Sequence, residues 1–214
     1  MDLYVIGAGG HGRELHSYIR NLQQAGWRGT LQGYLDDTLA PGVYGRLEIL
    51  GPIESLNILP DAATHYITAL GSNAVRRKVV ERLTARYGSR LTPWTLVHTQ
   101  STIGEDVEIG SGTCLAPGAI VTATARIGSH CILNVKASVS HDCVIGDFVN
   151  INPAATLCGS VTVGEGAYIG AGAVVKERIS IGAWSTIGAG AAVVRDVPEG
   201  VTVVGVPARV IKKH

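Results

Sequence analysis

The sequence predicts a small α/β domain over residues 1–92, followed by a parallel β-helix over residues 93–214. Three observations support this assignment. Aliphatic residues recur every six positions through the second part, apolar and helical segments alternate through the first, and the chain has 28 glycines but only 5% aromatic residues. A core of this composition is filled by small aliphatic side chains, which is typical of repeat folds built from short strands.

The first domain alternates between strand-like and helix-like segments. We expect strands at residues 3–6, 31–37 and 65–70, a helix from Arg13 to about Gln24, and a second helix that starts near Asn73. A connection rich in glycine and proline separates the second and third strands. This alternation predicts a small parallel sheet that binds its ligand at the carboxyl ends of the strands.

The loop after the first strand is rich in glycine. Gly7, Gly9 and Gly12 have the spacing of a dinucleotide-binding loop, and Asp36 lies at the distance expected for a ribose contact. Glycines allow a phosphate group to approach the backbone, and the following helix N-terminus favours its negative charge. Taken alone, the loop predicts NAD binding. Because the domain is short and a β-helix follows it, we favour a Rossmann-like domain that binds a nucleotide sugar.

The second part carries an uninterrupted six-residue repeat. Seventeen positions, from Val97 to Val193, are all Val, Ile or Leu, and the fourth residue after most of them is small or β-branched. This period fits neither an α-helix nor isolated hairpins, but it fits short strands joined by corners around a prism. With three repeats to a coil and the usual strand spacing, the prism is roughly 27 Å long. The frequent glycine after each aliphatic residue is expected to provide corner conformations.

The ends of such a prism expose unpaired strand edges. The first domain and residues 198–214 are therefore expected to cap them.

Composition and charge exclude several classes of function. The net charge of +1 gives no basic face for a nucleic acid. Residues 1–5 do not resemble a signal peptide, and apolar runs are too short to span a bilayer. The four cysteines do not have the spacing of a metal site. We expect a cytoplasmic protein with reduced thiols that binds no metal, no membrane and no nucleic acid.

His141 is the candidate catalytic residue of the repeat. It lies two positions after an aliphatic residue, so we expect it on the outer surface, next to the Asp142 carboxylate. An imidazole can accept a proton near neutral pH, and the neighbouring anion would stabilise the charged ring. Cys143 is expected to point inward as a small apolar side chain rather than act as a nucleophile. His130 is expected to face the surface without a role.

The whole chain resembles the NeuD/PglD-like sugar acetyltransferases. The resemblance rests on Gly-Ala-Gly-Gly-His-Gly at 7–12, Leu-Asp-Asp at 35–37, Gly-Ser-Asn at 71–73, the hexapeptide units and Gly-Val-Pro-Ala-Arg at 205–209. It implies a left-handed β-helix, a homotrimer, and acetyl-CoA bound between subunits. In the best-understood branch the acceptor is a UDP-linked 4-amino-4,6-dideoxy sugar of glycan biosynthesis.

The resemblance also implies site residues. His141 corresponds to the catalytic base of the family, and Asp142 to the acid that tunes it. Nucleotide-sugar contacts are implied at Gly9, Gly10, His11, Asp36, Asp37 and Gly71. Acetyl-CoA contacts are implied at Gly159, Ala171 and Ala189, and at Asn150, which stands where the characterised branch has a second histidine. Asparagine can form a hydrogen bond there but carries no charge.

Other functions remain open from the sequence. A hydroxyl of a sugar such as a sialic acid could accept the acetyl group in place of an amine, with the same base. The glycine-rich loop could belong to a nicotinamide-binding module. A scaffold without chemistry would predict that His141→Ala changes nothing except solubility.

Overall fold

The computed structural model describes residues 1–56 and 64–214, which form two compact units, Met1–Thr95 and Leu96–His214. The units divide after Thr95 because residues 91–93 join the sheet of the first unit as its last strand. Among the described residues, no helix is long and apolar enough to cross a membrane.

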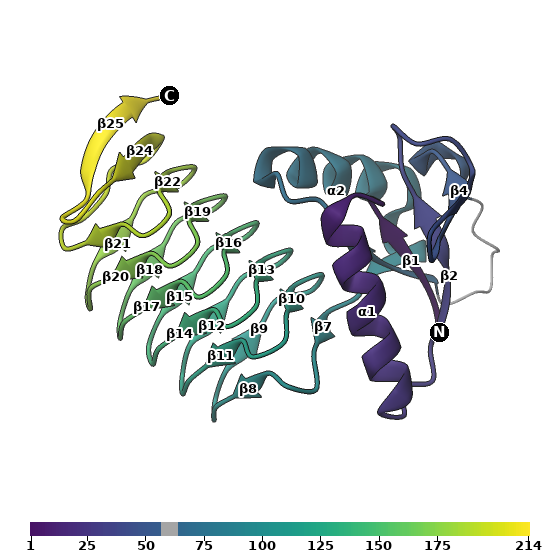
Figure 1. Ribbon diagram of the computed structural model, residues 1–214, viewed down its shortest axis with the longest axis horizontal. Coiled ribbons are helices and arrows are strands. Elements are labelled where there is room, and N and C mark those ends of the chain that lie inside the picture. Colours follow the sequence, from purple (N-terminus) through teal and green to yellow (C-terminus); the bar gives the residue numbers. More distant parts are fainter. Residues whose placement is uncertain (57–63) are drawn as a thin grey trace. The chain divides into compact units, whose positions relative to one another are not determined.

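The first unit is a six-stranded sheet with two long helices (Figure 1). The strand order is β3-β4-β2-β1-β5-β6, and all pairs are parallel except β3 with β4. Its elements are β1 (Asp2–Ile6), α1 (Gly10–Gln24), β2 (Thr30–Leu35), β3 (Gly42–Tyr44), β4 (Leu47–Gly51), the 3₁₀ turn Ile53–Ser55, β5 (Thr64–Thr68), α2 (Asn73–Tyr87), the 3₁₀ turn Gly88–Arg90 and β6 (Leu91–Pro93).

The expected strand and helix alternation is confirmed, with several differences. Strand β5 ends at Thr68 rather than at residue 70, and β6 was not expected. Helix α1 begins at Gly10 rather than Arg13, because Gly9 already serves as its N-cap. Strand β2 ends at Leu35, so the two aspartates that follow it lie in a loop. The hairpin of β3 and β4, which turns at Gly45 with a φ of 65°, was not expected from the sequence.

Strand β1 lies at the centre of this unit. Its Leu3, Val5 and Ile6 side chains are fully buried, as are Leu15 and Ile19 of α1. The chain places β2 on one side of β1 and β5 on the other. The carboxyl ends of β1 and β5 therefore form a topological switch point, where sheets of this kind bind ligands.

The second unit is a β-helix of two-residue strands, and from β7 to β20 each strand pairs in parallel with the strand 18 residues later (Figure 1). The expected coil of three six-residue repeats is thus confirmed. The strands are β7 (Leu96–Val97), β8 (Thr102–Ile103), β9 (Glu108–Ile109), β10 (Cys114–Leu115), β11 (Ile120–Val121), β12 (Arg126–Ile127), β13 (Ile132–Leu133), β14 (Ser138–Val139), β15 (Val144–Ile145), β16 (Asn150–Ile151), β17 (Thr156–Leu157), β18 (Thr162–Val163), β19 (Tyr168–Ile169), β20 (Val174–Val175), β21 (Ser180–Ile181), β22 (Thr186–Ile187) and β23 (Ala192–Val193).

These strands form the three faces of a prism. Face 1 contains β7, β10, β13, β16, β19 and β22; face 2 contains β8, β11, β14, β17, β20 and β23; face 3 contains β9, β12, β15, β18 and β21. We call the edge between faces 2 and 3 the His141 corner; it consists of residues 104–107, 122–125, 140–143, 158–161 and 176–179.

Side chains of the repeat fill the prism as expected. From Leu115 to Val193, every sixth residue is buried, and from Thr113 onward so is the residue four positions after each aliphatic one. Cys143 is one of these and is fully buried. The first coil is less complete, because Ile103 retains 40% exposure.

The glycines that directly follow the aliphatic residues have a different role from the one expected. The left-handed backbone falls three positions after the aliphatic residue, and ten non-glycine residues adopt it, among them Thr124 and Asp142. Gly110 follows its aliphatic residue directly and has no positive φ. A Cβ on Gly110 would lie 2.5 Å from the carbonyl carbon of Gly128. Such glycines are therefore required by the close approach of the next coil.

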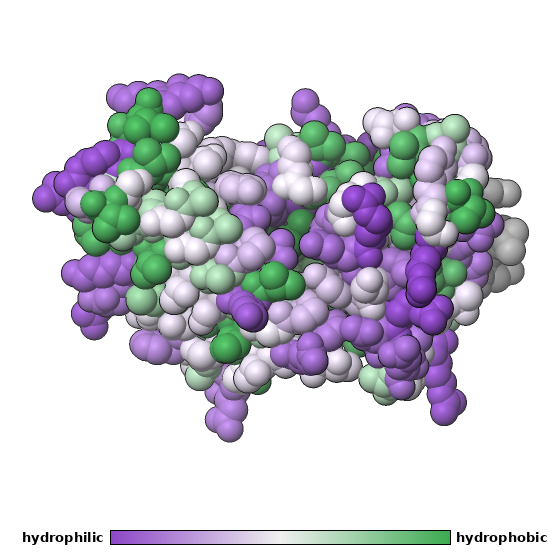
Figure 2. Space-filling model, in the orientation of Figure 1, coloured by the Kyte–Doolittle hydropathy of each residue, from purple (hydrophilic) through white to green (hydrophobic). Residues whose placement is uncertain are grey.

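The C-terminal residues continue one face and end it. Strand β24 (Val201–Val204) pairs in parallel with β22, and β25 (Arg209–Lys213) pairs in antiparallel fashion with β24. Val201 and Val203 are buried, which confirms the predicted cap at this end. Figure 2 shows hydrophobic surface over these strands beside hydrophilic surface, and the exposed apolar side chains there include Val206 and Ile211.

Candidate active site

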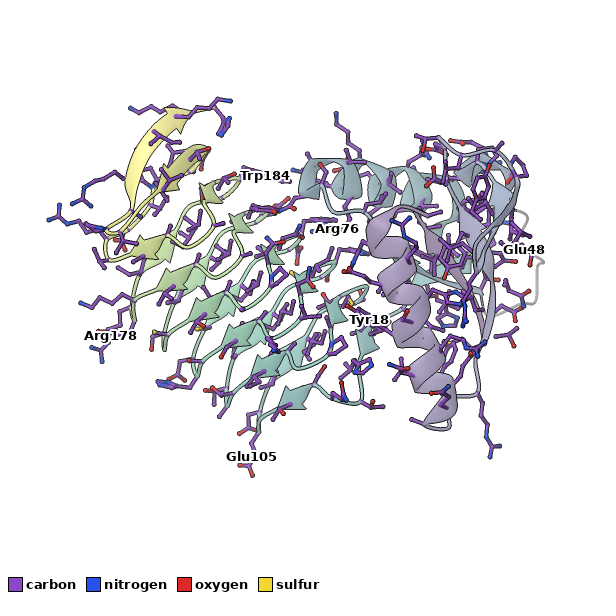
Figure 3. The ribbon with its side chains drawn as sticks, in the orientation of Figure 1. Tyr18, Glu48, Arg76, Glu105, Arg178 and Trp184 are labelled. Carbon is purple, nitrogen blue, oxygen red and sulfur yellow. The ribbon has the colours of Figure 1, made fainter. Side chains whose placement is uncertain are left out.

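His141 lies on the surface of the His141 corner, between β14 and β15. Its side chain is 63% exposed. Figure 3 labels Glu105 and Arg178, which lie along this same edge of the prism. His141 lies between them in the stack, because backbone hydrogen bonds join the turns at this corner from one coil to the next.

Asp142 orients the imidazole. Nδ1 of His141 lies 2.8 Å from Oδ2 of Asp142. An ionised carboxylate accepts hydrogen bonds only, so Nδ1 carries the hydrogen and Nε2 is left with its lone pair. The hydrogen bond from His141, followed by one from Thr124, holds the pKa of Asp142 below its ordinary value. The pair can thus present a proton acceptor to solvent.

The imidazole lies against Gly159 of the next coil. A Cβ added to Gly159 would be 2.6 Å from both Cε1 and Nε2 of the His141 ring. Gly159 has no positive φ, so its backbone does not require glycine. The absence of a side chain at Gly159 therefore makes room for the ring, a role that the sequence analysis did not assign to it.

Cys143 does not share the surface with His141. Its Sγ points to the carbonyl oxygen of Cys158 at 3.2 Å, and burial raises the pKa of its thiol. A buried thiol with a raised pKa is a poor nucleophile. The structure therefore supports a structural role for Cys143.

The expectation that His130 faces the surface is wrong. The residue is 6% exposed and stacks on Phe148, with ring centroids 5.2 Å apart and an interplanar angle of 12°. Its ring folds over Gly112 of the preceding coil, where a Cβ would lie 2.3 Å from Nδ1 of His130. At this edge of the prism, rings stacked from coil to coil cover the third position after the aliphatic residue. At the His141 corner the same position faces solvent, as at Thr124 and Asp142.

The other residues implied to contact acetyl-CoA are spread over the prism. Ala171 and Ala189 are exposed one above the other at the edge between faces 1 and 2. They are thus separated from His141 and Gly159 by the width of face 2. Asn150 is on face 1, and only 3% of it is exposed. Roles for these three residues remain predictions.

The glycine-rich loop of the first unit divides into structural and open positions. Gly7 has a φ of 104°, and a Cβ on Gly12 would lie 2.6 Å from the carbonyl oxygen of Gly7. By contrast, a Cβ on Gly9 or Gly71 would meet no atom within 4 Å, and one on Gly10 only the end of Arg13 at 3.8 Å. The open positions are those for which the resemblance implies a ligand.

His11 is fixed at the start of α1. Its Nδ1 lies 2.8 Å from Oε2 of Glu14, and this hydrogen bond lowers the pKa of the Glu14 carboxyl. Nε2 of His11 is buried and has no hydrogen-bond partner among the described residues. Within the same part of the chain, no side chain caps the N-terminus of α1. This end of the helix can therefore accept an anionic ligand.

Asp36 ties the loop after β2 to the loop after β1. Its Oδ2 accepts a hydrogen bond from the amide of Ala8 at 2.8 Å. Its Oδ1 accepts from the amide and hydroxyl of Thr38 and from the amide of Leu39. Burial acts to raise the pKa of Asp36, but these hydrogen bonds outweigh it, and the pKa lies below its ordinary value.

Asp37 fixes the same loop to other elements. Its Oδ1 accepts a hydrogen bond from the amide of Ile53 at 2.9 Å, and its Oδ2 pairs with the guanidinium of Arg82 on α2. Arg82 also contacts Glu54. Both aspartates therefore shape the loop, whether or not they also contact a ligand.

Asp36→Asn is expected to lower the free energy of unfolding by about 1–3 kcal/mol at pH 7, because the amide replaces one of two accepting oxygens with a donor. The folded pKa of Asp36 is depressed, so its contribution is present above the unfolded pKa of about 3.9 and is lost as the pH falls through the folded pKa. Urea unfolding at pH 7 and pH 3 measures the difference in the free energy of unfolding between the variant and the wild type.

The matched control for this prediction is Glu48→Gln, because Glu48 is exposed on β4 of the same unit (Figure 3). It should leave the free energy of unfolding unchanged at both pH values. A destabilisation of Asp36→Asn that stays the same at pH 3 would contradict the role given to the carboxylate.

A cavity of about 240 Å³ opens beside these loops. It lies at the carboxyl ends of β1 and β2, and its lining is apolar apart from the loop after β2. The lining residues are Ile6, Gly7, Leu35, Asp36, Asp37, Thr38, Ile53, Leu70, Val75 and Val79. A flat, partly apolar group such as a nucleotide base fits this chemistry.

Metal chemistry finds no support in the described residues, among which no cluster of three or more His, Cys, Asp or Glu side chains could hold an ion. The His141 and Asp142 pair is one base and one carboxylate, which is a proton-transfer arrangement.

Known proteins match both units. Residues 2–83 match the model of the PglD N-terminal domain, and residues 160–195 match the bacterial transferase hexapeptide (six repeats). The acetyltransferase domain of PglB from Neisseria gonorrhoeae FA1090 is 33% identical to this chain and superposes with a TM-score of 0.87. The match covers 98% of this chain and 99% of the PglB domain. The chain belongs to the PglD-like sugar acetyltransferases.

Two further relatives have a named activity or bound ligands. PerB from Caulobacter crescentus, solved with CoA and GDP-perosamine, is 30% identical over 99% of this chain and 98% of its own, with a TM-score of 0.87. UDP-N-acetylbacillosamine N-acetyltransferase from Bacillus subtilis (strain 168) is 40% identical over 118 residues, which is 53% of this chain. The match spans half of that relative's length.

Family membership confirms the expected fold, a Rossmann-like domain followed by a left-handed parallel β-helix. It also places the protein among enzymes, because the family consists of acetyltransferases that use acetyl-CoA. The PglB domain has itself been solved in complex with acetyl coenzyme A.

Proposed function

We propose that this PglD-like protein is an acetyl-CoA-dependent N-acetyltransferase that acts on a nucleotide-linked amino sugar, such as a UDP-4-amino-4,6-dideoxy sugar. The observation that carries the proposal is the His141 and Asp142 pair, which holds Nε2 free on an exposed corner. Relatives that act on UDP-N-acetylbacillosamine or bind GDP-perosamine support the choice of acceptor.

His141 acts as the general base. As the sugar amine attacks the thioester carbonyl, Nε2 accepts the proton that the nitrogen loses, and the charged ring is stabilised by Asp142. The imidazolium then returns a proton to the departing sulfur. The transfer is direct, because the nearby Cys143 thiol is buried and cannot form an acyl-enzyme.

The first unit supplies the nucleotide site. Gly9, Gly10 and Gly71 leave space for a ligand beside the N-terminus of α1, and His11 offers the buried Nε2. Asp36 and Asp37 border the cavity at the strand ends. Because the Asp36 carboxylate already accepts four hydrogen bonds, it is poorly available for the ribose contact of an NAD site.

Acetyl-CoA is the acetyl donor. Gly159 lies under the base, and Ala171, Ala189 and Asn150 complete the proposed contacts on other parts of the prism. These proposed contacts lie on two different edges of one β-helix. Such a distribution is expected if acetyl-CoA binds between neighbouring copies of the chain, and it supports a homotrimer. We further propose that the enzyme works in the cytoplasm, where acetyl-CoA and sugar nucleotides are made.

The test measures release of the CoA thiol from acetyl-CoA with a panel of acceptors. The panel pairs UDP- and GDP-linked 4-amino-4,6-dideoxy sugars with the matched 4-hydroxy sugars, and adds free sialic acid. We expect turnover with an amino sugar only. Turnover with hydroxyl acceptors only would replace the proposal with O-acetylation, and NAD binding without acetyl-CoA binding would contradict both.

A further inference from the structure

A hydroxyl from the preceding coil contacts the carboxylate that orients the base. Thr124 lies 18 residues before Asp142 at the His141 corner. Its Oγ1 is 2.7 Å from Oδ1 of Asp142, while Oδ2 of the same carboxylate is 2.8 Å from Nδ1 of His141. Three side chains from two coils thus form one continuous line of hydrogen bonds that ends at the imidazole.

The hydroxyl hydrogen of Thr124 has two acceptors within reach. Oγ1 is also 2.6 Å from the carbonyl oxygen of Ala123. A carboxylate is the stronger acceptor because it carries a full charge, so the hydrogen is donated mainly to Asp142. Thr124 and Asp142 share a left-handed backbone, with φ of 60° and 59°, and this brings their side chains together along the corner.

The contact matters because the pair it supports is exposed. The side chains of His141 and Asp142 are 63% and 58% exposed, and a pair in water does not hold one geometry by itself. Asp142 can rotate toward solvent unless its second oxygen is held. Thr124 supplies that second attachment from a rigid neighbouring coil.

We propose that Thr124 is a positioning residue of this enzyme, whose hydroxyl fixes the Asp142 carboxylate so that the imidazole of His141 presents Nε2 to the acceptor. This inference rests on the proposed function, since it concerns the same base. Thr124 acts through Asp142 and does not touch the reacting atoms.

The line of hydrogen bonds is the main influence on the pKa of the Asp142 carboxyl. The preceding coil presents Ala123 and Thr124 to it, and the following coil presents Gly159 and Ser160, none of which is charged. The nearest charged side chains of the corner lie two coils away, about 10 Å in either direction. They are Glu105 and Asp106 on one side, and Lys176, Glu177 and Arg178 on the other. Just past the corner, Arg126 of β12 pairs with Val144 in the strand ladder, and its guanidinium contacts Glu108.

The kinetic test compares Thr124→Val with Thr124→Ser. Valine keeps the shape but loses the hydroxyl, and kcat should fall about two- to tenfold, the rate equivalent of one hydrogen bond, with KM for both substrates unchanged. Serine should restore kcat. Thr102→Val, at an exposed threonine of β8 two coils from His141, is the matched control and should leave kcat unchanged.

The same substitution made in the Asp142→Ala variant distinguishes positioning of Asp142 by Thr124 from a general structural effect. In Asp142→Ala, adding Thr124→Val should cause no further loss of kcat, because the partner through which Thr124 acts is already absent. A further loss in that background, or a wild-type kcat in Thr124→Val, would overturn the proposal while leaving the proposed function intact.

A measurement without turnover tests the contact if the proposed function itself fails. The pKa of Asp142 can be followed by carboxyl NMR in the full-length protein. Loss of the Thr124 hydrogen bond should raise that pKa toward the ordinary value, whereas Thr124→Ser should keep it low. An unchanged titration in Thr124→Val would overturn the inference whether or not the enzyme turns over.

Discussion

Replacing His141 with alanine is expected to lower kcat about 100- to 10,000-fold, which is the usual contribution of a general base. Nε2 of His141 is free because Nδ1 is held by Asp142, and the corner contains no second histidine. His141→Gln should be equally inactive, because its amide keeps polarity and size but has no basic lone pair. Thiol release from acetyl-CoA with the best acceptor measures the effect.

The control for this variant is His214→Ala. His214 is also exposed, and its ring hydrogen-bonds with the hydroxyl of Thr202 near the end of the β-helix, so loss of this ring should leave kcat unchanged. Since the His141 side chain is largely exposed, His141→Ala should unfold at the same urea concentration as wild type. A kcat within threefold of wild type would remove His141 from the mechanism.

Gly159→Ala is expected to lower kcat about 100-fold, although alanine differs from glycine by one methyl group. That methyl would lie 2.6 Å from Nε2 and Cε1 of His141, so the ring must shift by about 1 Å or rotate away from Asp142. The backbone of Gly159 accepts alanine, because its φ is not positive. The fall should therefore appear in kcat with little change in stability.

Gly118→Ala gives the matched control. A Cβ at Gly118 would be 3.4 Å from the nearest atom, the flexible Lys136 side chain. Ala154 already adopts the same left-handed backbone at that edge of the prism, so the strain is tolerated. Wild-type kcat is expected for Gly118→Ala. Equal kcat for the two alanine variants would show that the His141 ring does not need the space at Gly159.

The register of the β-helix could be predicted because every sixth residue must be aliphatic to fill the prism. That single constraint places Cys143 inside and His141 outside, as the structure confirms. The alternating segments of the first unit were equally readable, since buried strands are continuous apolar runs. The hairpin of β3 and β4 was not, because β3 has only three residues, all of them exposed, and the alternation of buried and exposed side chains in β4 spans only five residues.

Side-chain relations between coils could not be predicted in the same way. Whether a residue contacts another 18 positions away depends on ring orientation and on the left-handed corners, which the repeat does not encode. His130 was wrongly expected at the surface because Phe148 covers it from the next coil. Thr124 and the space above Gly159 were missed for the same reason.

The 18-residue register also limits how such a gene can change in length. Whole coils added or removed after residue 178 keep Thr124, His141 and Gly159 stacked as neighbours, since each retains its edge and level. A loss of six residues between His141 and Gly159 would instead bring Glu165 beneath the imidazole. Length changes that preserve the base are thus whole coils placed after residue 178, and of the proposed site residues only Ala189 would change its level in the prism.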